Sequence, residues 1–140
     1  MKLVQLIYLS ELIGRDETSL GPILSASVRR NLEASVTGML LYSQGTFLQV
    51  LEGEEGAVNA TYQRIEQDPR HHRLVLLSVE PIAQREFDRW SMGFRHLSHA
   101  DAQHLPRMAP WFRFGFSADA LNTAPRIARD MLAFFNPQAN

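Results

Sequence analysis

A predicted β-hairpin constrains the fold of this chain more than any other stretch. Two runs rich in leucine, β-branched and aromatic residues, 37–43 and 45–51, flank Ser43-Gln44-Gly45. Glycine supplies the positive φ angle that a tight hairpin turn needs, so the two runs are predicted to pair as antiparallel strands.

Gln49 places a primary amide within the otherwise apolar second strand of this hairpin. Because side chains alternate along a strand, it shares one face with Phe47 and Leu51. A buried amide without a partner costs about 1–3 kcal/mol, so Gln49 needs a hydrogen-bonding partner. Two interpretations remain open: a bond to backbone or water on a partly wet face, or a bond to a polar ligand that lies on the sheet.

Length and composition indicate one globular domain. The chain has 140 residues, of which 45% are hydrophobic and 21% charged, as in ordinary globular proteins. Its 14 basic and 15 acidic residues lack the basic excess that binding to a phosphate backbone needs, so no nucleic-acid partner is expected. The absence of cysteine excludes disulfides, thiolate metal sites and thiol catalysis.

The N-terminal apolar segment is too short for a signal sequence or a membrane span. It follows Lys2 and is interrupted early by Glu11 and Arg15. No membrane segment is therefore expected, and the cytoplasm is the expected location.

The segments before the hairpin read as one strand and one helix. The apolar run 3–9 has the length of a buried strand, with Val4, Leu6 and Tyr8 on one face. The polar stretch 10–19 is predicted to be a loop. Residues 19–34 are predicted to be helical, because positions suited to an apolar stripe recur there at helical spacing: Leu20, Ile23, Leu24, Ser27 or Val28, and Leu32.

A second helix is predicted after the hairpin, with Val58, Tyr62 and Ile65 on its apolar stripe. It ends at Asp68-Pro69, because the residue before proline disfavours the α region. Two more strands are predicted at 74–82 and 89–97. The order predicts an α+β sandwich of ferredoxin-like βαββαββ topology, in which a five-stranded mixed sheet carries two helices on one face.

Residues 98–140 differ in character from residues 1–97. Pro106, Pro110 and Pro125 interrupt this tail. A helical stripe follows Pro125 and consists of Ile127, Met131, Leu132 and Phe135. The stripe either packs on the open face of the sheet or forms a surface for self-association or a partner protein. We therefore expect one domain at 1–97 and a helical extension at 98–140.

Familiar enzyme signatures are absent from the sequence. It contains no G-x-G-x-x-G after the first strand, no P-loop and no G-x-S-x-G elbow. No metal site is predicted, because the five histidines lack metal-ligand spacing and are interpreted as surface or turn residues: His71, His72, His96, His99 and His104. Glu52, Glu54 and Glu55 lie where the hairpin leads into the second helix, and acidic side chains stabilise a helix N-terminus.

Three polar residues stand out among the predicted elements. Tyr8 lies in the first strand, Gln49 in a neighbouring apolar strand, and Asn31 near the end of the helix that would cross above them. Each is more often structural when taken alone. Together they are expected to converge on one polar, planar ligand held between the two helices.

An ordered set of motifs over residues 2–97 resembles a known family. The matching segments are Leu6-Ile7-Tyr8-Leu9-Ser10, Arg30-Asn31, Val36 to Tyr42, Gly45 to Gly53, Tyr62 to Ile65, Asp68 to His71 and Phe87 to Gly93. In this order and spacing they resemble the BLUF domains, blue-light sensors that use flavin. The chain departs from many relatives at Arg30, where they have a second asparagine.

The resemblance implies a set of flavin contacts. Tyr8 and Gln49 are expected beside the isoalloxazine ring, and Asn31 at its polar edge. Arg64 and Asp68 match positions that meet the ribityl or phosphate end. The expected apolar and lining contacts are Ile23, Leu24, Ser27, Phe47 and Ile65, and the expected switch positions on the last strand are Trp90 and Met92.

The same resemblance implies a photoreceptor and not an enzyme. The expected cofactor is FAD, with FMN and riboflavin as alternatives, bound without a covalent bond. Light is expected to draw an electron and a proton from Tyr8 and to rearrange Gln49, and the last strand and the C-terminal helices then signal to an unidentified partner protein. We also expect a homo-oligomer of two or more subunits.

Two further hypotheses remain open on the residues alone. One is a small flavin-dependent redox enzyme, because a flavin beside a tyrosine can support redox chemistry. The other is a ligand-free interaction module of ferredoxin-like shape, which the apolar stripe of the tail motivates.

Overall fold

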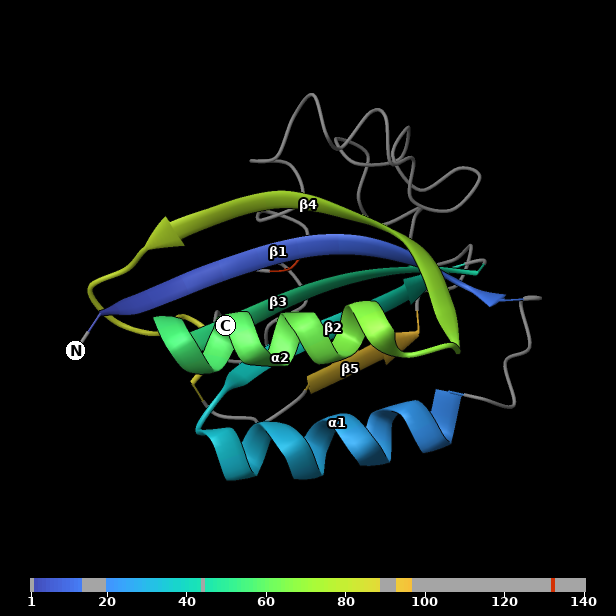
Figure 1. The fold of residues 1–140 in the computed structure, drawn as a ribbon, viewed down its shortest axis with the longest axis horizontal. Coiled ribbons are helices and arrows are strands. Elements are labelled where there is room, and N and C mark those ends of the chain that lie inside the picture. The colour runs from blue at the N-terminus through green and yellow to red at the C-terminus, as the bar shows by residue number, and fades with distance from the viewer. Residues whose placement is uncertain (1, 14–19, 44, 89–92, 97–131, 133–140) are drawn as a thin grey trace.

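The computed structural model describes residues 2–13, 20–43, 45–88, 93–96 and 132 (Figure 1). Its elements follow the predicted order of strands and helices. They are β1 (Leu3–Leu12), α1 (Leu20–Ala34), β2 (Thr37–Ser43), β3 (Thr46–Glu54), α2 (Glu55–Gln67), β4 (His71–Pro81) and β5 (Gly93–His96). The βαββαββ prediction is thereby confirmed.

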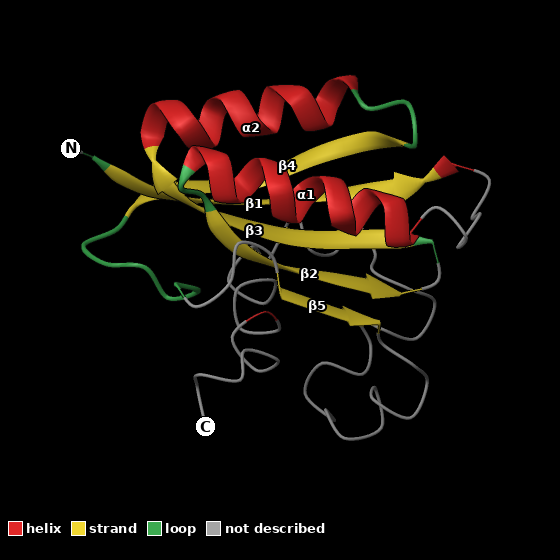
Figure 2. Ribbon diagram, turned by 90° about the horizontal axis from the view of Figure 1, so that it is seen from below, coloured by secondary structure: helices red, strands yellow, loops and turns green. Residues whose placement is uncertain are grey.

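The strands form one mixed sheet of five strands in the order β4-β1-β3-β2-β5. The pair β2 and β5 is parallel, and the other neighbouring pairs are antiparallel. Both helices lie on the same face of this sheet, as Figure 2 shows from the side. The predicted ferredoxin-like α+β sandwich is therefore correct.

Element boundaries differ from the predicted ones around Ser10 and His71. Glu11 pairs with Thr46 and Leu12 with His71, so β1 continues through residues that were predicted to form a loop. The same pairing starts β4 at His71, before the predicted start at Leu74. The loop prediction was wrong for residues 10–12 because strand pairing, which a local pattern does not contain, extends the strand. Residues 14–19 lie outside the described part of the chain.

The buried face of α1 also differs from the predicted stripe. Leu20, Ile23 and Leu24 pack against the core as predicted. Of the two alternatives, Ser27 is half-buried and Val28 is 39% exposed, while Leu32 is 71% exposed and does not face the core. With 3.6 residues per turn, positions 20, 24, 27 and 31 share a face, and Leu32 lies beside that face. Asn31 consequently occupies the buried position, and it is the one fully buried residue of this helix.

The N-terminus of α2 corrects the interpretation of Glu52. Glu54 caps this helix, because its carboxylate accepts a hydrogen bond from the Ala57 backbone N–H at 3.2 Å. Glu52 does not serve the helix; it is fully buried in the sheet. The alternation along β3 places Glu52 on the opposite face from Gln49.

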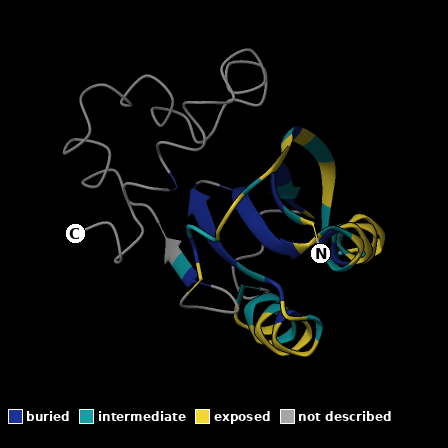
Figure 3. Ribbon diagram, turned by 90° about the vertical axis from the view of Figure 1, so that its left-hand side faces the viewer, coloured by how far each residue is buried: buried dark blue, intermediate teal, exposed yellow. Residues whose placement is uncertain are grey.

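The central strands are buried on both faces (Figure 3). Between the helices and the sheet lies a core that includes Val4, Leu6, Leu40, Tyr42, Leu51 and Val58. On the other face, Ile7, Leu9, Leu41, Leu48 and Val50 are each at most 1% exposed. Leu132, the described residue of the tail, is also buried, while the rest of the predicted unit 98–140 lies outside the described residues. Packing of that tail on the sheet stays a prediction.

Two glycines of the hairpin meet steric requirements that other residues would violate. Gly45 has a φ angle of 87°, in the left-handed region. A Cβ atom at Gly38 would overlap the carbonyl oxygen of Val50 on β3. The close pairing of β2 with β3 therefore depends on the absence of a side chain at position 38.

We predict that Gly38→Ala destabilises the fold by about 3 kcal/mol, because the added methyl group must displace the backbone of a central strand. Gly21→Ala is the matched control. Gly21 lies in the first turn of α1, and a Cβ atom added there meets no atom within 4 Å. The higher helix propensity of alanine should raise the stability of this variant by up to about 1 kcal/mol. Urea unfolding of both variants measures the difference, and equal stabilities would contradict the prediction.

Candidate functional site

Tyr8 and Gln49 lie directly opposite each other on β1 and β3. The tyrosine hydroxyl donates a hydrogen bond to the side-chain oxygen of Gln49. Both side chains are buried, at 2% and 3% exposure. One partner of the Gln49 amide is thus a tyrosine side chain on the neighbouring strand, and both groups face the helices.

The surroundings of Tyr8 keep its phenol protonated. Burial raises the pKa of Tyr8 far above its ordinary value, and the nearby Tyr62 and Asp68 raise the pKa further. The Tyr62 ring meets the Tyr8 ring edge-on, with centroids 5.3 Å apart. A neutral phenol remains a hydrogen-bond donor, which suits the bond to Gln49.

Asn31 and Gln49 line the same small cavity between the two helices and the sheet. This cavity measures about 30 Å³, and its other lining residues include Ser27, Thr61 and Ile65. The backbone carbonyl of Asn31 accepts a hydrogen bond from the Val36 N–H at 2.9 Å, which fixes the end of α1 above the sheet. The fold therefore brings together Tyr8, Asn31 and Gln49 from three different elements.

A second cavity of about 30 Å³ contains Tyr8. It is lined by Tyr8, Ile23, Ser27, Leu40, Phe47, Gln49, Ile65, Asp68 and His71. It shares Gln49, Ser27, Ile65 and Asp68 with the first cavity, so the two spaces are neighbours. We call the cavity with Tyr8 the inner cavity and the cavity with Asn31 the middle cavity.

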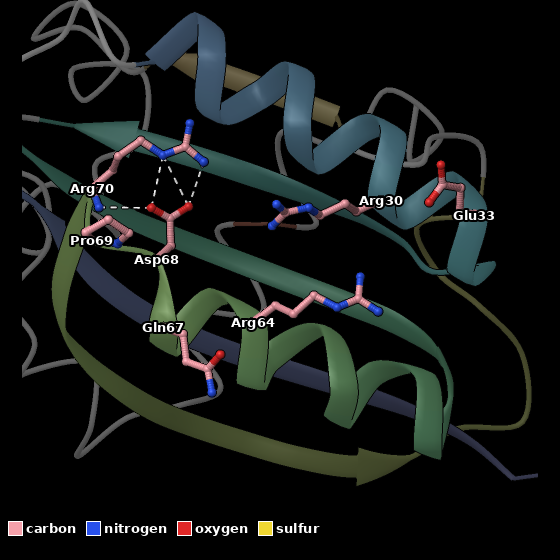
Figure 4. A pocket seen from close by; sticks show the side chains of 7 residues that line it. All are labelled: Arg30, Glu33, Arg64, Gln67, Asp68, Pro69 and Arg70. Atoms are coloured by element: carbon pink, nitrogen blue, oxygen red, sulfur yellow. Dashed lines mark hydrogen bonds and ion pairs between the residues drawn. The ribbon is translucent and has the colours of Figure 1, made fainter.

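A larger open cleft of about 660 Å³ adjoins the middle cavity and shares Arg30, Arg64, Asp68 and Arg70 with it. Figure 4 shows Arg30 extending from α1 and Arg64 from α2 into the space between the helices. Asp68 accepts hydrogen bonds from the Arg70 guanidinium at 2.7 to 3.2 Å, and this lowers the pKa of its carboxyl. The cleft thus presents two arginines on facing helices beside a paired Asp68 and Arg70.

His71 belongs to the site, so its interpretation as a surface residue was wrong. Its Nδ1 lies 2.9 Å from the Ser10 hydroxyl, and its ring meets the Phe47 ring edge-on at 6.2 Å. Burial lowers the pKa of His71, although the nearby Asp68 opposes this effect. The spacing of the histidines gave no indication that His71 belongs to the site. The family-matching segment Asp68 to His71 did contain this residue.

The structure places most of the remaining predicted site residues in these three spaces. Ile23, Ser27, Phe47, Ile65 and Asp68 line the inner cavity, and Arg64 lines the middle cavity and the cleft. Leu24 packs against the core and is not among the lining residues. Leu40 and Thr61 line the cavities without having been predicted. Trp90 and Met92 lie outside the described residues.

The described part of the chain contains neither a metal-ligand cluster nor a membrane-spanning helix. Among its residues, no three histidine, aspartate or glutamate side chains gather closely enough to hold a metal ion. None of its helices combines the length and apolar character needed to cross a membrane.

Comparison with known proteins gives a family match over residues 3–93, to the family described as sensors of blue-light using FAD (BLUF). The chain is 43% identical over 68 residues to the photoactivated adenylate cyclase subunit beta of Euglena longa. This match covers 49% of this chain and 8% of that protein. It is 39% identical over 93 residues to the blue light- and temperature-regulated antirepressor BluF of Escherichia coli K12. This second match covers 64% of this chain and 23% of that protein.

Solved structures of similar fold include a BLUF protein and the protein BlsA. The dark-state structure of BlrB, a BLUF protein, has a TM-score of 0.72 at 31% identity and covers 96% of this chain and 98% of that one. The photo-activated state of BlsA has a TM-score of 0.76 at 25% identity, with 94% of each chain covered. Sequence and fold agree in these matches, and the chain belongs to the BLUF family, the sensors of blue light using FAD.

Proposed function

We propose that this protein is a blue-light photoreceptor, and not an enzyme, that binds a flavin between α1, α2 and the sheet. The observation that carries the proposal is the buried Tyr8 and Gln49 pair, which lies at the inner end of a row of spaces that opens at an arginine-lined cleft. Membership of the BLUF family supports the same assignment.

The residues around the cavities fit a flavin chemically. An isoalloxazine ring has apolar faces and a polar edge, and Ile23 of α1 and Ile65 of α2 offer apolar surface on either side. The amides of Asn31 and Gln49 supply donors and acceptors for the edge. The inner and middle cavities adjoin each other and the arginine-lined cleft, so the three spaces together suit an elongated ligand that carries a ring at one end and phosphates at the other.

Tyr8 and Gln49 supply the photochemical step in this proposal. A bound flavin contributes the absorption of blue light and an oxidising excited state. Tyr8 is neutral and already donates its proton in a hydrogen bond to Gln49, so an electron and a proton can leave the phenol together. Gln49 carries two donors and one acceptor on a short side chain, and turning or tautomerising this amide changes the hydrogen bonds in the site.

The signal reaches another protein in this proposal. The chain spans 8% and 23% of the two curated relatives named above, which are described as a photoactivated adenylate cyclase subunit and an antirepressor. We infer that the change at Gln49 passes through β5 and residues 98–140 to a partner protein, and that the chain works as a homo-oligomer. The small shift in hydrogen bonding biases a two-state element, since one such bond is worth about 1 kcal/mol.

FAD is the proposed flavin. Arg30 and Arg64 face the cleft from two helices, and paired guanidinium groups suit the phosphates of a dinucleotide. The same two guanidinium groups would have only one phosphate to bind in FMN and none in riboflavin.

We predict that Tyr8→Phe and Gln49→Leu keep bound flavin but abolish the reversible light-induced shift of its absorption spectrum. Phenylalanine lacks the hydroxyl that gives up a proton, and leucine keeps the volume of glutamine without hydrogen bonds. Tyr42→Phe is the matched control, because Tyr42 is fully buried in the same sheet and packs on Phe47 at 5.1 Å. A normal shift in either site variant would remove the mechanism.

We predict that replacing Arg30 and Arg64 together by glutamine weakens FAD binding about tenfold or more, because hydrogen bonds to a charged group are each worth about 1.5–3 kcal/mol. Riboflavin binding should be unchanged. Arg29→Gln, an exposed neighbour on α1 that does not line the cleft, is the control. Fluorescence titration of the flavin measures both affinities, and an equal loss for riboflavin would contradict the phosphate assignment.

We predict that His71 makes the protein less stable as the pH falls. Burial holds its pKa below the ordinary value in the folded state, so the unfolded state takes up the proton first. Between about pH 7.5 and pH 5.5 this residue contributes a loss of at most about 1.4 kcal/mol per pH unit. Thermal unfolding of His71→Asn should show a shallower pH dependence than wild type, whereas His72→Asn, an exposed neighbour, should follow wild type.

A further inference from the structure

A fully buried carboxylate lies on the face of the sheet away from Gln49. Glu52 of β3 has no exposed surface and lines none of the three spaces described above. Its two oxygens accept hydrogen bonds from the Gln5 side-chain amide at 2.7 Å, the Phe87 N–H at 2.7 Å and the Glu86 N–H at 3.2 Å. An acid in such a position is costly unless donors surround it, and here three do.

Two of these three donors are backbone groups of one segment. Glu52 therefore fixes the main chain of Glu86 and Phe87, which follow the end of β4. Burial raises the pKa of Glu52, and the hydrogen bonds from Phe87, Gln5 and Glu86 oppose that rise. The bonds thus compensate part of the cost of burying the acid, and the acid in turn holds the segment.

Arg85 attaches the same segment a second time. Its guanidinium donates to the Thr37 hydroxyl at 2.9 Å, to the Glu52 carbonyl at 3.0 Å and to the Ser35 carbonyl at 2.8 Å. Thr37 and Glu52 are partners across the β2 and β3 pair. Residues 85–87 are therefore fastened to the end of the hairpin at which β2 begins and β3 ends.

The chain order makes this attachment relevant to the site. Gln49 and Glu52 lie on the same strand, three positions apart. Phe87 precedes the stretch that carries Trp90 and Met92, and Gly93, which follows this stretch, pairs with Met39 of β2. The stretch between Phe87 and Gly93 is thus tied at both of its ends to the hairpin that carries Gln49.

We propose that Glu52 is a positioning residue of the photocycle. Its carboxylate couples β3 to the backbone of Glu86 and Phe87, so that a rearrangement at Gln49 reaches the residues that follow Phe87. The proposal rests on the photoreceptor function proposed above. It adds a residue that acts from the opposite face of the sheet, through the attached segment and not through contact with the flavin.

Glu52→Gln is the decisive substitution. The amide has one acceptor oxygen and one NH₂ group where the carboxylate has two acceptors, so at least one of the three donors loses its partner. In this proposal the segment opens transiently during the return to the dark state, so a segment that opens more readily lowers the barrier to that return. We expect exchange of the Glu86 and Phe87 amide hydrogens to rise about tenfold or more, since a hydrogen bond to a charged group is lost.

In FAD-loaded Glu52→Gln, the dark spectrum and the size of the light-induced shift should be retained. Thermal return to the dark spectrum should become about tenfold faster. Glu80→Gln is the matched control, because Glu80 is an exposed carboxylate on β4 that pairs with Gln5 in register. Gln5→Leu removes the side-chain donor but keeps both backbone bonds, so its return rate should stay near that of wild type.

A return rate within about twofold of wild type, together with faster exchange and lower stability, would overturn the proposal and leave Glu52 a purely structural acid. If Glu52→Gln does not fold, Glu52→Asp takes its place, because it keeps the charge while withdrawing both oxygens by one methylene group. The return rate and the amide exchange of Glu52→Asp then distinguish a positioning residue from a purely structural acid. A wild-type protein without any light-induced shift would instead contradict the proposed function, while the exchange measurement would still test the attachment.

Discussion

The hydrogen bond between Tyr8 and Gln49 is the interaction on which the site depends. It joins the two central strands through side chains, in a part of the core where both groups are buried. The pairing register of β1 with β3 places them directly opposite each other, and a slip of one residue would turn one of them to the other face. The antiparallel ladder therefore sets the relative position of these two side chains as well as the fold.

The same ladder holds a second polar pair three positions further along. Gln5 faces Glu52 across β1 and β3, on the opposite side of the sheet from Tyr8 and Gln49. One strand thus carries an amide toward the cavities and an acid toward the segment 85–87. Gln49 and Glu52 therefore lie on opposite faces of one continuous strand, three positions apart.

Much of the fold followed from local sequence pattern. The hairpin turn at Gly45, the helical spacing in α1 and α2 and the stop at Asp68-Pro69 predicted the element order and the two-layer architecture. Tyr8, Asn31 and Gln49 were also identified as a group, because polar residues in apolar elements need partners. The family motifs then assigned them to a flavin.

Other features depend on pairing between distant segments, which periodicity does not reveal. The extension of β1 past Ser10 and the burial of His71 both follow from the β1 and β4 register. Glu52 lies beside two acids that serve or adjoin a helix terminus, and only the arrival of Glu86 and Phe87 shows that it has another role. Leu32 of α1 was misplaced, and the choice between Ser27 and Val28 stayed open, because a wide apolar pattern fits more than one face of a helix.

The central claim is that this chain holds a flavin whose hydrogen bonding changes with light. The most direct measurement is the absorption spectrum of the wild-type protein, reconstituted with FAD, in the dark and after blue light. The account predicts a bound yellow flavin whose spectrum shifts under blue light and returns in the dark without loss of absorbance. A protein that stays colourless with FAD, or that binds FAD and shows no reversible shift, would contradict it.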